Sequence, residues 1–153
     1  MSKNVFPIVV IGLLVAILAV VGYKLSPMRN QNADVTLPVA SCSPAFQPCT
    51  MTLPNGRTLG FSIEPRPVKP LQPLLLKVTA EGTEAQSVDV DFNGTDMDMG
   101  YNRVSLTRDQ HGFSGQAMLP VCVTGTMTWT ATVLLTTPTQ RIAVPFHFVI
   151  AGR

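Results

Sequence analysis

The sequence is poor in charged residues, histidine and cysteine. Only 13% of the 153 residues are charged, the formal net charge is +2, and there are two histidines and three cysteines. So small a positive charge gives no reason to expect a nucleic-acid partner. The closely spaced Cys and His pairs of a zinc site are missing, as are a C-x-x-C pair, an H-E-x-x-H motif and a Gly-rich phosphate loop. We therefore expect the protein not to be an enzyme.

Residues 5–22, VFPIVVIGLLVAILAVVG, contain no charged side chain. At about 1.5 Å per residue a helix of this length spans roughly 27 Å, close to the hydrocarbon thickness of a bilayer. Tyr23 and Lys24 then suit the membrane–water interface. A cleaved signal peptide is the alternative, but its apolar run is normally shorter, and Val20-Val21-Gly22 matches a cleavage site poorly. The pattern favours a transmembrane anchor over residues 5–23.

This anchor divides the rest of the chain. We expect a cytoplasmic stub at residues 1–4, a polar tether at residues 24–34 and one exported domain at residues 35–153. Positive charges are nearly balanced on the two sides of the anchor, so the short stub and the long domain decide the orientation. The predicted location is the inner (cytoplasmic) membrane, with the C-terminal domain in the periplasm.

Beyond residue 35 the pattern predicts short strands and turns. Asn55-Gly56 indicates a hairpin with a type I′ turn, and residues 74–78 read as a strongly buried strand. Residues 88–92, 126–132 and 141–150 alternate between apolar and polar positions, as strands do.

The strand count sets the expected fold. Residues 64–73 carry four prolines and can be neither helix nor central strand, so we expect them to cross between sheets or follow an edge. Seven to nine short strands with frequent turn signals predict an all-β domain, an antiparallel Greek-key (Ig-like) β-sandwich. No stretch after the anchor shows a helical period.

Met97 and Met99 are the first candidates for chemistry. They alternate with Asp96 and Asp98 just before Gly100. In an extended backbone both thioethers would project to the same side. Thioethers are soft ligands that favour Cu(I), which makes the pair a candidate metal site. The alternative is a methionine pair that covers an edge of the core.

The cysteines allow several interpretations. Cys42 and Cys49 are flanked by Pro44 and Pro48 and could close as a local disulfide in an oxidising compartment. Cys122 could be a small buried hydrophobe, a thiolate ligand or the disulfide partner of another cysteine. We therefore keep Cys49 and Cys122 as candidate metal ligands beside the methionine pair.

The remaining methionines and the two histidines are less suited to a metal site. Met127 should lie in the core with Trp129, while Met51, close to Cys49 in sequence, could approach the site. His111 should be exposed in a turn, and His147 is out of phase with the apolar face of the last strand, so the two histidines do not suggest a metal site.

Acidic residues crowd one part of the sequence. This stretch contains no Lys or Arg and holds Glu81, Glu84, Asp89, Asp91, Asp96 and Asp98. It could be a solvated strand face, or a patch that attracts a cation or a basic partner.

Three of these stretches together carry a family resemblance. The stretch with Met97, Met99 and Gly100, the Gly112-Phe113-Ser114-Gly115 strand, and the strand with Met127 and Trp129 resemble exported Ig-like or cupredoxin-like domains of the FixH/YtkA-like families. The resemblance covers about residues 64–137. It implies a role in copper handling or haem-copper oxidase assembly, with a respiratory oxidase or a copper-delivery pathway as partner.

Two functions follow from the sequence. The first is a membrane-anchored accessory protein that binds or passes on copper, Cu(I), through Met97, Met99, Cys122 and Cys49. The second is a metal-free β-sandwich interaction module that binds a partner in a membrane complex. Copper affinity separates the two, because the first requires it.

Overall fold

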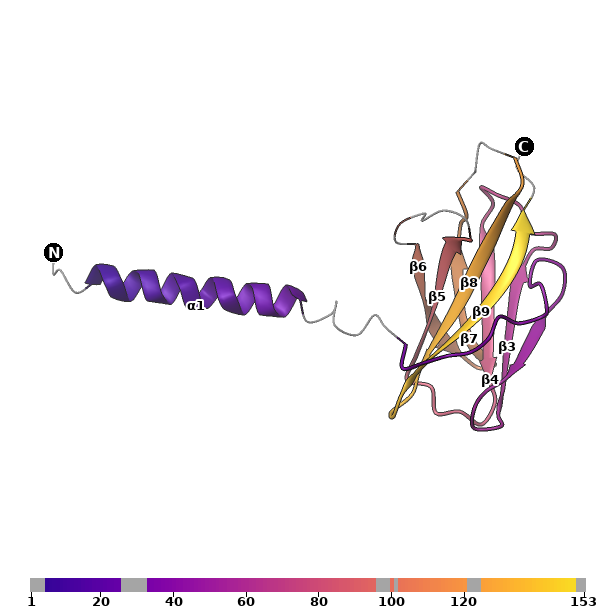
Figure 1. Ribbon diagram of the computed structural model, residues 1–153, viewed down its shortest axis with the longest axis horizontal. Helices are drawn as coiled ribbons and strands as arrows, with labels where there is room; N and C mark the ends of the chain where they lie inside the picture. The colour runs from indigo at the N-terminus through magenta and orange to yellow at the C-terminus, as the bar shows by residue number, and fades with distance from the viewer. Residues whose placement is uncertain (1–4, 26–32, 96–99, 101, 121–124, 151–153) are drawn as a thin grey trace. The chain divides into compact units, whose positions relative to one another are not determined.

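The structure, a computed structural model, describes residues 5–25, 33–95, 100, 102–120 and 125–150 (Figure 1). The chain divides into two units, residues 1–32 and residues 33–153. The second unit therefore begins two residues before the expected domain start at residue 35.

The first unit contains helix α1 (Val5–Leu25). Pro7 falls in its first turn, where the N–H that proline lacks would have no partner inside the helix. The side chains described in α1 are those of residues 9–21. Among the residues that the structure describes, no helix is long and apolar enough to cross a membrane.

The second unit is mostly β, as the sequence predicts. Its nine strands are β1 (Val35–Thr36), β2 (Cys49–Thr52), β3 (Thr58–Glu64), β4 (Leu74–Ala80), β5 (Ser87–Gly94), β6 (Arg103–Asp109), β7 (Gly112–Ala117), β8 (Met127–Thr136) and β9 (Arg141–Ile150).

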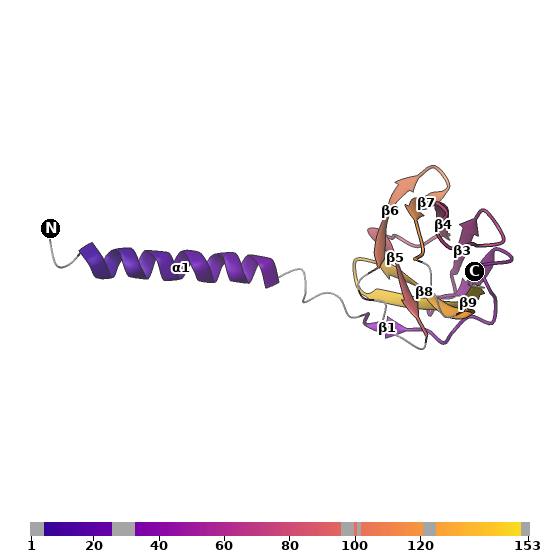
Figure 2. The same cartoon turned by 90° about the horizontal axis from the view of Figure 1, so that it is seen from above.

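The strands form one curled sheet in the order β1-β9-β8-β5-β6-β7-β4-β3-β2. Strand β6 joins the two halves, because its residues 103–106 pair with β5 and its residues 107–109 pair with β7. Figure 2 shows the strands following one another around the core. The sheet is mixed rather than purely antiparallel, since β1 pairs with β9 in parallel.

Apolar side chains fill the space inside the curl. Alternation along β8 and β9 turns Trp129 and Met127 inward with Phe146 and Phe148, and all four are buried. Phe92 of β5 meets Phe148 edge to face, with ring centroids 6.5 Å apart. The prediction that Met127 lies in the core is confirmed.

The β2–β3 hairpin is confirmed, but its turn is not of type I′. The Leu53 N–H donates to the Arg57 carbonyl oxygen at 2.7 Å, and the Gly56 N–H donates to the Leu53 carbonyl oxygen at 2.9 Å. Gly56 has φ +75°, whereas Asn55 has no positive φ. This is a three-residue loop closed by a left-handed glycine, and Pro54 at its first position favours it because proline fixes a negative φ.

Strand β4 is buried on one face only, which corrects the expectation of a strongly buried strand. Leu74, Leu76 and Val78 are buried, but Leu75 and Lys77 are exposed on the outer face. The run of three leucines conceals this alternation in the sequence.

The connections between strands lie at two opposite ends of the sheet. The loop end, toward which the arrowheads of β5 and β9 point in Figure 1, carries the β3–β4, β5–β6 and β7–β8 connections. The turn end carries the short connections β2–β3, β4–β5, β6–β7 and β8–β9. The chain enters the second unit at the turn end, where the Asp34 N–H donates to the Arg141 carbonyl oxygen at 2.8 Å.

Candidate functional site

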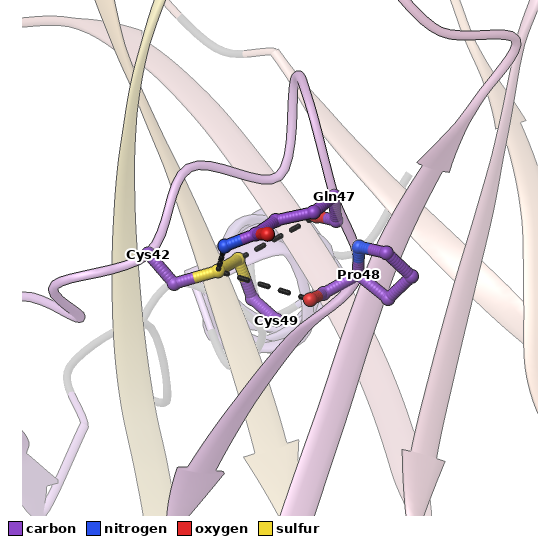
Figure 3. Close-up of a disulfide and its surroundings, with 4 residues drawn as sticks. All are labelled: Cys42, Gln47, Pro48 and Cys49. Carbon is purple, nitrogen blue, oxygen red and sulfur yellow. Dashed lines mark hydrogen bonds between the residues drawn. A yellow bond between two sulfur atoms is a disulfide. The ribbon is translucent and has the colours of Figure 1, made fainter.

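A disulfide joins Cys42 and Cys49, whose Cα atoms lie 5.8 Å apart (Figure 3). The Gln47 side-chain amide donates to the Cys42 sulfur at 3.6 Å, and the Pro48 carbonyl oxygen lies 3.8 Å from the same sulfur. Cys49 is fully buried at the start of β2, while Phe46 in the loop is exposed. The predicted disulfide is thus present, and it links the segment that runs beside β9 to the strand at the far edge of the sheet.

This disulfide corrects the prediction that Cys49 is a metal ligand. A cysteine in a disulfide has no thiolate to offer, and Cys49 is also shielded from solvent. The other predicted ligands, Met97, Met99 and Cys122, lie outside the described residues. Among the described residues, no group of three or more His, Cys, Asp or Glu side chains is placed to hold a metal ion.

The described residues on either side of the β5–β6 connection show where it leaves and rejoins the sheet. The Thr95 N–H donates to the Thr128 carbonyl oxygen at 3.0 Å, so the chain follows β8 beyond the end of β5. The chain returns at Asn102, whose carbonyl oxygen accepts from the Phe92 N–H at 2.9 Å. Both anchor points lie at the loop end.

The β7–β8 connection leaves and returns at the same end. Leu119, just after β7, accepts a hydrogen bond from the Leu71 N–H at 3.0 Å and is fully buried. The chain rejoins the sheet at β8, where Met127 pairs with Ile150 and Trp129 pairs with Gly94 of β5. The topology therefore brings the connection that contains residues 97 and 99 and the connection that contains residue 122 to one end of the sheet.

A hollow of about 470 Å³ opens on the outer face near the loop end. Glu64, Arg66, Leu75 and Gln116 line it together with Pro65, Pro73 and Leu74. Its charged rim is paired, since the Lys77 ammonium lies 3.0 Å and the Arg66 guanidinium 3.5 Å from the Glu64 carboxylate. The hydrogen bond from Lys77 lowers the pKa of Glu64 below its usual 4.5, and the charges of Lys77 and Arg66 lower it further.

Leu75 in the lining of this hollow and two further exposed apolar side chains at the loop end, Leu71 and Met118, are together named the apolar patch. Leu71 is 63% exposed and Met118 is 54% exposed. Leu71 has φ +55°, a backbone conformation that bulky residues rarely adopt, and its hydrogen bond to Leu119 holds it next to Met118. Exposed apolar groups on a constrained backbone suit contact with another molecule.

The acidic strand face is neutralised by neighbouring arginines. The Arg141 guanidinium lies 3.3 Å from the Asp89 carboxylate, and the Ser105 hydroxyl donates to Asp89 at 2.6 Å. Arg103 approaches Asp91 at 3.4 Å. Asp89 and Asp91 therefore form part of a structural network rather than an open cation site, while Asp96 and Asp98 lie outside the described residues.

The two histidines lie where their sequence pattern predicts. His111 is exposed in the β6–β7 turn, at the turn end, and His147 lies half-buried on the outer face of β9. Met51 is partly buried against the core.

Sequence reasoning missed the hollow and the apolar patch. They combine residues from three strands and a proline-rich loop, so nothing in the local pattern connects them. The one local signal is Leu75, at the polar phase of an alternating strand.

Comparison with known proteins identifies no family for this chain. No family model and no curated protein matches it. A crystal structure of an engineered protein from a structural genomics consortium aligns with 72% of this chain at 21% sequence identity and a TM-score of 0.43. The chain corresponds to 21% of the length of that engineered protein. So distant a similarity says nothing about the function of this chain.

Proposed function

We propose that this protein is a non-enzymatic, membrane-anchored accessory protein that binds Cu(I) at the loop end of an exported β-sandwich. In this proposal it passes copper on during copper homeostasis or the assembly of a haem-copper oxidase, the role that the FixH/YtkA-like resemblance implies. The curled sheet would be a Greek-key, Ig-like variant of the sandwich.

The proposed anchor is residues 5–23, within helix α1. The uncharged run and the flanking Tyr23 and Lys24 support it. The Cys42–Cys49 disulfide supports export to the periplasm, because disulfides persist in oxidising compartments and are rare in the cytosol.

One observation carries the copper proposal: the connections with Met97 and Met99 and with Cys122 leave and rejoin the sheet at the same end. Residues far apart in the sequence, such as Thr95 and Thr128, are hydrogen-bonded there. Two neutral thioethers and one thiolate form a soft, low-coordination ligand set suited to Cu(I). Because the disulfide occupies Cys42 and Cys49, Cys122 is the thiol that remains for this set.

A competition titration tests the proposal. The full chain in detergent is titrated with Cu(I) against a chromophoric chelator, as wild type and as Met97→Leu/Met99→Leu. Met118→Leu is the matched control, because Met118 is an exposed methionine at the same end of the sheet. We expect one tightly bound copper per chain, lost in the double variant and kept in the control; no binding above the chelator by the wild type overturns the proposal.

The apolar patch favours a second function, a metal-free module that binds a protein partner. Leu71, Leu75 and Met118 would contact the partner, and the hollow beside Glu64 and Arg66 would receive one of its side chains. If copper does not bind, this function becomes the better explanation of the loop end.

A further inference from the structure

Strand β2 forms one edge of the sheet and pairs with β3 alone. The Leu53 N–H donates to the Arg57 carbonyl oxygen, so these two residues are a hydrogen-bonded pair of the antiparallel ladder. Hydrogen-bonded pairs alternate with pairs that are not hydrogen-bonded. Met51 therefore bonds to β3, whereas Thr50 and Thr52 direct their backbone N–H and C=O groups away from β3, toward the outer side of the edge.

The neighbouring strand shows the same direction. Thr58 lies opposite Thr52, and its carbonyl oxygen accepts from the Glu81 N–H at 3.2 Å, on the β4 side. Thr50 and Thr52 are both exposed. Within the part of the chain that the structure describes, no backbone hydrogen bond reaches the outer side of β2. The edge therefore offers two N–H and two C=O groups to a further strand.

Strand β2 lacks the features that protect most sheet edges from association. Natural proteins usually place lysine, proline or a bulge within an exposed edge strand. The sequence of β2, CTMT, has neither charge nor proline, and its register with β3 contains no bulge. The Cys42–Cys49 disulfide holds the start of the strand in place, so the edge is already ordered before it pairs.

We propose that β2 pairs edge to edge, in antiparallel orientation, with β2 of a second copy of this chain. With the two-fold axis at Met51, Thr50 lies opposite Thr52 of the second copy, and Thr52 lies opposite its Thr50. Each open N–H and C=O group of one edge then meets its complement on the other. The next pair in this register is Pro48 with Pro54, and proline has no N–H to donate. The edge thus matches a second copy of itself in length and in register.

The side chains at this edge also suit self-association. Facing threonines form favourable cross-strand pairs, and β2 brings no charged groups together. Phe46, 69% exposed, lies in the loop that leads into β2. Its Cα atom is within about 11 Å of that of Cys49, because three residues of chain span no more. So short a strand pairing buries little surface, so we expect a weak dimer that forms as the concentration rises.

Two double substitutions test both the contact and its register. Thr50→Lys/Thr52→Lys places lysine opposite lysine in both pairs, and like charges directly opposite each other oppose pairing. Thr50→Lys/Thr52→Glu alters the same positions but places lysine opposite glutamate in both pairs. Sedimentation equilibrium of the full chain, with its free thiol alkylated, in a density-matched detergent measures the association. We expect the wild type and the lysine–glutamate variant to dimerise and the double-lysine variant to remain monomeric.

Amide hydrogen exchange locates the contact. In the wild type the N–H groups of Thr50 and Thr52 should exchange quickly at low concentration and more slowly as the dimer forms. The N–H of Met51 should be protected at every concentration, because it already bonds to β3. Its protection in the double-lysine variant shows that the strand is folded, so a loss of dimer there reports the edge and not unfolding.

Several results would overturn the proposal. A wild type that stays monomeric up to about 1 mM does not pair with itself, and its open edge is left for a strand of another protein. A double-lysine variant that dimerises like the wild type shows that the dimer uses another surface. A lysine–glutamate variant that stays monomeric contradicts the antiparallel register. Slow exchange of Thr50 and Thr52 in the monomer means that the edge is already covered.

Discussion

The rings of Phe61 on β3 and Phe146 on β9 have centroids 5.2 Å apart, although five strands separate β3 from β9 in the sheet order. The contact shows that the sheet curls until its two halves face each other. Both rings are buried. This closure gives the second unit a single core and places the strand ends at a common loop end.

Phe146→Ala should be among the most destabilising substitutions. It leaves a cavity where the two halves meet, so we expect a loss of about 3–5 kcal/mol in the free energy of unfolding. Urea unfolding followed by the fluorescence of Trp129, the single tryptophan, measures it. Val149→Ala, at an exposed position of the same strand, is the control and should change stability by less than about 1 kcal/mol; equal effects would contradict the packing described.

From the disulfide we predict the number of free thiols per chain and the loss of stability when the bond is removed. Protein isolated without reductant and then denatured should show one free thiol per chain, that of Cys122, since Cys42 and Cys49 are paired. Cys42→Ala/Cys49→Ala should lose about 2–3 kcal/mol in the free energy of unfolding, because a short loop is no longer closed in the unfolded chain. Reduction of the wild type should reproduce that loss, and three free thiols before reduction would refute the pairing.

Asp89→Asn tests the polar network on the outer face. The variant loses the charge that pairs with Arg141 and weakens the acceptor of the Ser105 hydroxyl. We expect a destabilisation of about 1–3 kcal/mol, because the arginine is left largely buried beside a neutral group. Glu81→Gln, at an exposed position of the β4–β5 turn, should have little effect in the same urea titration. If both variants behave alike, the Asp89 network does not stabilise the fold.

The ion pair of Glu64 and Lys77 should make part of the stability depend on pH. Folding lowers the pKa of Glu64, so its contribution is present above its usual 4.5 and is lost as the pH falls through the lower folded-state value. Urea midpoints of wild type and Glu64→Gln should therefore differ at pH 7 and converge well below pH 4.5. High salt should also reduce the difference, because both groups are partly exposed. A difference that is constant across the pH range would show that the carboxylate charge does not matter.

Local patterns predicted most of the strands, because alternation is a property of neighbouring residues. The inward faces of β5, β8 and β9 follow from it, and the β2–β3 hairpin follows from the adjacent Asn55 and Gly56. The same reasoning failed where a local pattern is compatible with two different local structures. Asn55-Gly56 suits two hairpin turns, and the three leucines of β4 conceal which of them faces solvent.

The pairing of strands that lie far apart in the sequence could not be predicted from local patterns. Nothing local shows that β1 pairs with β9 in parallel, or that β6 changes partners halfway along its length. His147 falls in the same class, because only the register from β5 through β8 to β9 brings it beside Thr130 and Thr95.

X-ray absorption at the copper edge gives the sharpest test of a copper site at the loop end. The full chain in detergent is loaded with one equivalent of Cu(I), desalted and measured alongside Met97→Leu/Met99→Leu. We predict that the wild type retains copper in a sulfur-dominated shell, and that the double variant loses the sulfur signal or the metal. A wild-type chain that emerges from desalting without copper, or that holds it with no sulfur ligand, would contradict this site.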